Sequence, residues 1–351
     1  MKKIFVAMLA LAAATACSND ELVSVNQEAI GFDNAFINNS VRSVNDPSYS
    51  NTNMFADFAV YGYVAGESSA SIFDGTQVSG TALNGEWTYT GTQYWIHGAD
   101  YTFHAVAPYN DGWTKTEAGI DSVKLSFTND GETDLLFATN DYGIYSYNEN
   151  QPVGKVGFNF RHVLSKVKFS FVNKYNATNS YLRVSNIKIE NAYATANATL
   201  NATTAWTGYA GTLELVFGNA NTTAQDTAAQ KFAYNPKTEV ESHNELLLIP
   251  GAVPSFKKGD VDVPGYKVTF TVEVLVGKDV IKTYNHVVAA NFIPVAGYTY
   301  DLKAELSHEN LDPEQPQEAI EFTVTKVIDW DEDHDGKENT AECDTDGDNQ
   351  V

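Results

Sequence analysis

Apolar and polar residues alternate along much of this chain. Segments 166–173, 183–192 and 267–276 change between apolar and polar side chains at almost every position. A period of two is typical of strands with one buried face, because successive side chains point to opposite faces of a sheet. Between two such runs, Gly277-Lys278-Asp279 predicts the turn of a β-hairpin.

Turn signals recur at short intervals, and no long stretch has the spacing of an amphipathic helix. Asp74-Gly75, Asn84-Gly85 and Asp130-Gly131 are examples of these turns. Segment 194–206, rich in Ala and Thr, is predicted to form small-residue strands or loops. Many short strands with frequent turns predict an all-β protein built of β-sandwiches.

The expected organisation has five parts. The chain is long enough for two domains of ordinary size, with a joint near 158–171 and a Pro- and acid-rich linker at 308–320. We expect a signal peptide at 1–16, a leader with a first strand at 17–42, sandwiches at 43–160 and 161–330, and a flexible acidic tail at 331–351. The second sandwich includes a final strand at 320–330.

The N-terminal residues have the features of an export signal. Lys2 and Lys3 precede a short apolar run, and Ala14-Thr15-Ala16 supplies the small residues that a signal peptidase requires. The run is shorter than the roughly 20 residues needed to span a bilayer. Cys17 follows directly and matches a bacterial lipobox, so we expect it to carry a lipid anchor, palmitate included, at the outer membrane. The alternative is an ordinary cleaved signal with a coincidental cysteine.

Composition narrows the function further. A net charge of −23 argues against nucleic-acid binding, where a basic surface is expected. The cysteines are Cys17 and Cys343, so a lipidated Cys17 leaves no pair for an intrachain disulfide. The histidines show no metal-binding spacing, and neither a GxSxG turn nor a P-loop is present. We therefore predict a protein that is not an enzyme.

The acidic tail holds the most specific local motif. Segment 331–342 fits the calcium-loop pattern D-x-[DN]-x-[DN]-G-x5-E, although a strand-like segment precedes it instead of a helix. Calcium is therefore the expected cofactor, and the alternative is a solvated acidic tail. The predicted ligands are Asp331, Asp333, Asp335, Lys337 through its carbonyl, Asn339 and Glu342, with Asp344, Asp346 and Asp348 in a second acidic turn.

An aromatic block occupies residues 87–103. Its side chains either form a sandwich core, which is the prediction here, or a stacking platform for glycans. The block comprises Trp87, Tyr89, Tyr94, Trp95, Tyr101 and Phe103. Elsewhere, Ser122 and Thr227 lie in Asp-[Ser/Thr]-apolar tripeptides that resemble bacterial O-glycosylation signals.

Several stretches, in a specific order, resemble the fimbrillin family of Bacteroides-type bacteria, the subunits of type V pili. Residues 18–21 after the lipobox cysteine resemble the acidic surface-export tag of such lipoproteins. The order then runs through EAIGFDNAFINNSVRS, FADFAVYGYV, WTYTGTQYWIHGADYTFHAVAP, TDLLFA, FNFRHVLSKVKFSF, ELLLIPGA and VAGYTYDLKAEL to FTVTKVIDW. Together they extend from Met1 to about Trp330. His162 matches a position that is commonly His in the family, where we expect it to close a structural hydrogen bond.

The resemblance implies two transthyretin-like β-sandwiches in tandem and a surface lipoprotein that serves adhesion. It also implies that an arginine-specific protease removes the first strand, and that a strand from another fimbrillin subunit replaces it. Arg42, followed by Ser43, is the position that would carry this cleavage; the alternative is an ordinary solvated arginine. We expect any donated strand to come from 320–330, since burying the acidic tail would be costly.

Two other function classes stay open. One is a glycan-binding surface lipoprotein of a polysaccharide-uptake system, which would need an exposed tryptophan such as Trp95. The other is a hydrolase whose paired carboxylates come from different strands. The surface or receptor that the protein recognises cannot be read from these residues.

Overall fold

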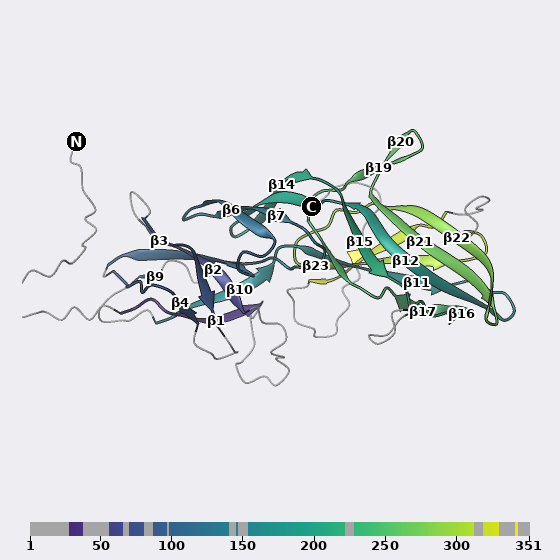
Figure 1. The fold of residues 1–351 in the computed structure, drawn as a ribbon, viewed down its shortest axis with the longest axis horizontal. Coiled ribbons are helices and arrows are strands. Elements are labelled where there is room, and N and C mark those ends of the chain that lie inside the picture. The colour runs from purple at the N-terminus through teal and green to yellow at the C-terminus, as the bar shows by residue number, and fades with distance from the viewer. Residues whose placement is uncertain are drawn as a thin grey trace, which may run out of the picture.

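The computed structural model describes residues 28–37, 56–65, 70–80, 87–96, 98–139, 145–146, 154–221, 228–311, 319–329 and 341–342. In this part of the chain every regular element is a strand and none is a helix, which confirms the all-β class. The molecule is elongated, with the strands of residues 32–162 toward one end and most strands of residues 165–290 toward the other (Figure 1). The transthyretin-like form of the domains stays a prediction.

The largest sheet has eight strands and belongs to the first half. Its edge strand β1 runs parallel to its neighbour, and the other described pairs are antiparallel. Across the sheet the order is β1 (Phe32–Ile37), β10 (Val156–His162), β8 (Leu136–Thr139), β5 (Asp100–Ala107), β2 (Asp57–Val64), β3 (Ala70–Ser79) and β4 (Thr88–Tyr89), with β9 (Tyr145–Ser146) paired to β5.

This sheet is buried on both faces. In β2, residues 58–63 are buried without interruption. Phe58 and Val60 pack into a core on one face, and Ala59 and Tyr61 pack into a second core on the other. A strand covered on both faces has a continuous apolar sequence instead of an alternating one, which explains the run FAVYGYV.

A four-stranded sheet covers the second of these cores. Its order is β14 (Thr204–Ala210), β13 (Thr195–Leu200), β7 (Val123–Thr128) and β6 (Trp113–Ala118). Residues 195–200 pair with 123–128 along their whole length, and Ala196 and Ala198 pack beside Leu125 and Phe127. The Ala- and Thr-rich segment is therefore a hairpin, and the first sandwich is completed by residues beyond the expected boundary at 160.

Two further sheets enclose a third core in the second half. Their strands include the alternating segments of the sequence, and a two-residue turn at Gly277-Lys278 joins β21 to β22 as predicted. The strand order of one sheet is β17 (Asn235–Glu241), β11 (Ser165–Asn173), β23 (Tyr298–Leu306), β24 (Phe322–Asp329) and β25 (Ala341–Glu342), with β18 (Leu246–Leu248) paired to β11. The strand order of the other is β15 (Leu213–Gly218), β12 (Ser180–Ala192), β21 (Tyr266–Val276) and β22 (Asp279–Ala290), with β16 (Phe232–Ala233) paired to β12.

A separate two-stranded hairpin, β19 (Ser255–Lys258) and β20 (Val261–Pro264), projects from the second half (Figure 1). Its base is held by Asn191, whose Nδ2 donates to the carbonyl oxygen of Gly265 at 3.1 Å. Most of its side chains are exposed, including Val261. The hairpin adds nothing to the three cores.

Candidate functional site

The N-terminal strand fills a slot in the first sandwich. Its backbone is hydrogen-bonded on two sides, because Val156 N donates to the carbonyl of Gly31 at 2.8 Å, while Ile30 N donates to the carbonyl of Gln93 at 2.9 Å. Trp95 N donates in turn to the carbonyl of Glu28 at 3.0 Å. Residues 28–32 therefore lie between β10 and segment 87–95, and we call this place the leader slot.

Two side chains of the leader close the core beneath the slot. Ile30 and Phe32 are each 1% exposed. The ring centroid of Phe32 lies 5.4 Å from that of Phe73, 5.5 Å from Tyr89 and 6.0 Å from Phe158. Removing a buried phenylalanine side chain costs about 3–5 kcal/mol. The leader is thus an integral part of the core.

The aromatic block supplies one wall of the slot. The hydroxyl of Tyr89 donates to the carbonyl oxygen of Ile30 at 2.7 Å. Trp87, Trp95, Tyr101 and Phe103 are buried, with Trp95 only 2% exposed. The predicted core role of these four residues is confirmed, whereas Trp95 offers no stacking surface for a glycan. The sequence did not indicate that this block holds the leader.

Between its two buried residues the leader presents Gly31 outward, beside Lys155. A Cβ atom built on Gly31 would lie 3.1 Å from Cγ of Lys155, and its other neighbours within 4 Å are carbons of the same side chain. Lys155 is exposed. A small adjustment of this flexible side chain would therefore accept a larger residue at position 31.

A second constellation lies where the two halves of the molecule meet. Nδ1 of His162 lies 2.5 Å from Oδ2 of Asp134, and the imidazole is 8% exposed. The loop that carries Asp134 is tied to the second half, since Leu247 N donates to the carbonyl of Gly131 at 2.9 Å. His162 thus makes the structural contact that was expected.

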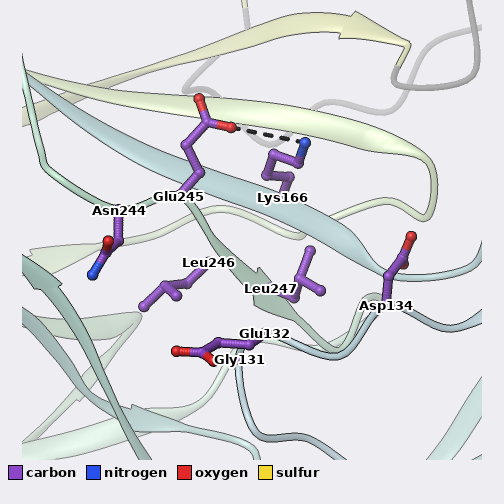
Figure 2. Close-up of a pocket in the computed structure, with 8 residues that line it drawn as sticks. All are labelled: Gly131, Glu132, Asp134, Lys166, Asn244, Glu245, Leu246 and Leu247. Carbon is purple, nitrogen blue, oxygen red and sulfur yellow. Dashed lines mark ion pairs between the residues drawn. The ribbon is translucent and has the colours of Figure 1, made fainter. Parts of the chain in front are cut away.

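A cleft of about 390 Å³ opens beside this loop (Figure 2). Lys166 Nζ lies 3.8 Å from Oε2 of Glu245 at its rim, and Glu132 and Asp134 line the same cleft. Within the described ranges, no three His, Cys, Asp or Glu side chains are grouped closely enough to hold a metal ion. The lining of the cleft thus includes the Lys166–Glu245 ion pair and Asp134, the partner of His162.

Two histidines are buried in the cores, and burial lowers the pKa of each. Burial lowers the pKa of His286 to about 4, and burial also lowers the pKa of His104 despite the hydrogen bond between its Nε2 and the carbonyl of Ile120. Both imidazoles stack on phenylalanine rings, His286 on Phe270 and His104 on Phe137. They are core residues, neutral at physiological pH.

Most of the predicted site residues lie outside the described part of the chain. Ser122 lies in the turn between β6 and β7, where its carbonyl accepts a hydrogen bond from Gly119 N at 2.9 Å. Glu342 belongs to β25 and is paired with Thr325 of β24. The residues outside are Cys17, Arg42, Ser43, Thr227, Asp331, Asp333, Asp335, Lys337, Asn339, Asp344, Asp346 and Asp348.

A search of the described residues found no helix with the length and apolarity of a membrane span.

The chain belongs to the Fimbrillin-like family, which matches residues 42–330. This membership confirms the resemblance seen in the sequence and identifies a fimbria-associated surface protein. The match begins at Arg42, so the leader precedes the matched region. No curated protein matches the chain.

Several solved structures are similar to this chain over most of its length. A candidate cell adhesion protein of Bacteroides uniformis is 16% identical, with a TM-score of 0.44 over 86% of this chain and 98% of that one. A fimbrial assembly protein of Parabacteroides distasonis is 9% identical, with a TM-score of 0.42 over 86% and 97%. The fimbrial anchor protein Mfa2 of Porphyromonas gingivalis is 11% identical, with a TM-score of 0.35 over 84% and 93%.

Proposed function

We propose that this chain is a non-enzymatic fimbrial subunit of the cell surface, serving adhesion, in which the leader is a removable plug. One observation carries the proposal: Ile30 and Phe32, N-terminal to Arg42, are buried in the core of the first sandwich. Cutting the chain after Arg42 would leave the leader held by non-covalent contacts alone. Another subunit's strand could then replace it.

The contacts that the leader makes in the slot explain why another strand could replace it. Loss of the leader exposes the apolar pocket around Phe73 and Phe158 and frees backbone groups of Gln93, Trp95 and Val156. Unpaired strand edges favour the addition of another strand. A donated strand would satisfy these backbone groups and fill the pocket with its alternate side chains.

Anchoring and metal binding complete the proposal. Cys17 would carry the lipid that holds an uncut chain at the outer membrane. The acidic segment 331–348 would bind calcium weakly, as extracellular calcium modules do, in the range of about 0.1–1 mM.

N-terminal sequencing of the protein recovered from the native cell surface tests the central claim. A chain that starts at Ser43 and migrates as a ladder of detergent-resistant oligomers supports strand exchange. A matched cell expressing Arg42→Ala should retain monomers acylated at Cys17. If the wild-type protein is also uncut and monomeric, the plug mechanism is wrong for this chain.

A further inference from the structure

A second cleft, of about 450 Å³, lies where the two halves of the molecule meet. One wall comes from the end of β10 and from residues 202–209 of the β13–β14 hairpin, and the other comes from segments 250–251 and 293–296. Pockets that bind small molecules have volumes of about 300–1,000 Å³ and combine an apolar lining with a few placed polar groups. We call this place the junction cleft.

The wall formed by segment 293–296 exposes apolar side chains on a fixed backbone. Ile293 is 62% exposed and Val295 is 44% exposed. The backbone of Val295 is held on both sides, because its N–H donates to the hydroxyl of Tyr300 at 3.0 Å and its carbonyl accepts from the hydroxyl of Ser165 at 2.6 Å. A ligand therefore meets a wall that is already ordered, which lowers the entropic cost of binding.

The opposite wall is held in the same way. The guanidinium of Arg161 donates from Nη1 to the carbonyl oxygen of Ala202 at 2.9 Å. Nε1 of Trp206 donates to the carbonyl of Val163 at 3.2 Å, and the hydroxyl of Tyr209 donates to a backbone carbonyl of segment 250–251 at 2.7 Å. Because these polar atoms bind backbone carbonyls, both aromatic rings stay in place as apolar parts of the lining.

This lining fits a pyranose sugar better than a peptide. The C–H bonds on one face of a pyranose ring are apolar and pack on aromatic and aliphatic side chains such as Trp206 and Ile293. The sugar hydroxyls can donate to and accept from the exposed hydroxyl of Thr203. A peptide that adds as a strand needs a free backbone edge, whereas the N–H and the carbonyl of Val295 already have partners.

The charge of the junction cleft differs from that of the whole chain. The chain has 45 acidic residues and 22 Lys and Arg, yet the described residues that line this cleft include Arg161 and no Asp or Glu. Asp134 is paired with His162 and lines the other cleft (Figure 2). Exposed charges more than about 8 Å away are largely screened at physiological ionic strength. A carboxylate in this cleft would therefore meet a positive charge.

We propose that the junction cleft binds an acidic glycan, through a pyranose sugar that carries a carboxylate, as uronic and sialic acids do. Trp206 contacts the face of the ring together with Ile293 and Val295, and Arg161 pairs with the carboxylate. The inference gives the adhesion in the proposed function a class of ligand and rests on it in that respect. It requires neither cleavage of the leader nor strand exchange.

Saturation-transfer NMR on the full, uncut chain tests the proposal. The acidic probes are methyl β-D-glucuronide and 3′-sialyllactose, and their neutral counterparts are methyl β-D-glucoside and lactose. We expect an acidic probe to bind at millimolar concentration, about tenfold more tightly than its counterpart, as one charge-assisted contact predicts. Thr203→Glu puts a negative charge at the cleft and should remove this preference. The control is Thr207→Glu, at an exposed position of β14 outside the lining.

A second variant removes the apolar wall. The double substitution Ile293→Ser and Val295→Ser leaves the backbone hydrogen bonds in place and should weaken binding at least about tenfold. Its control is Val261→Ser, at a valine that is 65% exposed on β20. Circular dichroism and thermal denaturation verify that each variant is folded.

Three outcomes would overturn the inference. If the neutral probes bind as tightly as the acidic ones, or if Thr203→Glu has no effect, the cleft does not recognise a carboxylate. If no probe shows saturation transfer, the cleft is not a glycan site. If binding survives the double substitution, the glycan binds elsewhere. None of these results bears on the leader plug, which N-terminal sequencing at Ser43 tests separately.

Discussion

The side-chain amide of Asn129 donates from Nδ2 to the carbonyl oxygen of Leu247 at 3.1 Å, across 118 residues of sequence. Its Oδ1 accepts from Gly131 N at 3.0 Å, so one buried side chain satisfies backbone groups from both halves of the molecule. The junction is therefore fixed by buried polar contacts as well as by apolar packing.

Asn129→Ala should destabilise the protein. The substitution leaves the carbonyl of Leu247 and the amide of Gly131 buried without these partners, which costs about 1–3 kcal/mol for each unsatisfied group. Urea unfolding followed by tryptophan fluorescence measures the loss. The control is Asn285→Ala, which alters a solvent-facing contact with Thr271 and should change stability by less than about 0.5 kcal/mol. Equal effects of the two variants would contradict the role given to Asn129.

Phe32→Ala in the uncut chain should lower the free energy of unfolding by about 3–5 kcal/mol, because it empties a packed site in the core. Tyr94→Ala is the matched control. Tyr94 belongs to the segment that walls the slot, but its side chain is 46% exposed. Thermal denaturation should show a large loss of stability for Phe32→Ala and a small one for Tyr94→Ala. A Phe32 variant as stable as the wild type would show that the leader is not part of the core.

A fragment that ends at residue 162 should not fold. It lacks β13 and β14, and β7 would lose its pairing with residues 195–200 as well as the apolar contacts of Ala196 and Ala198. One-dimensional proton NMR should show poorly dispersed methyl resonances, whereas the full chain should show dispersed ones. A fragment with a cooperative thermal transition would contradict the shared core.

Acid should weaken the second sandwich through His286. Burial lowers its folded-state pKa to about 4, below the usual histidine value of about 6.5, so the native state binds its proton less readily than the unfolded state does. The stability that the protein gains from keeping His286 neutral is fully present above about pH 6.5 and is lost as the pH falls toward 4. The loss in the free energy of unfolding has an upper limit of about 3 kcal/mol.

The variant His286→Phe isolates this contribution. A phenylalanine can keep the stacking on Phe270, whose centroid lies 5.1 Å from that of His286, and it carries no titrating group. The stability difference between the variant and the wild type, measured by urea unfolding, should move in favour of the variant as the pH falls from 7 to 4.5. A difference that does not depend on pH would assign the acid sensitivity to other groups.

The sequence by itself determined the class of the protein and the position of many strands. Alternation over 166–173, 183–192 and 267–276 corresponds to β11, β12 and β21, because the period of side-chain direction is a local property of an extended chain. The ordered motifs also identified the family before any contact was known. Cys17, Arg42 and every predicted calcium ligand except Glu342 lie outside the described part, so these predictions stay predictions.

The tertiary structure decided which strands pair and which polar groups face one another. Residues 195–200 could have joined the second sandwich, yet they pair with 123–128. Alternation determines which side chains share a face of a strand, but it does not determine which strand pairs with it. In the same way, only the fold places Lys155 beside Gly31, and Asn129 beside Leu247. Pairing depends on contacts far apart in sequence, and it is settled by the packing of whole cores.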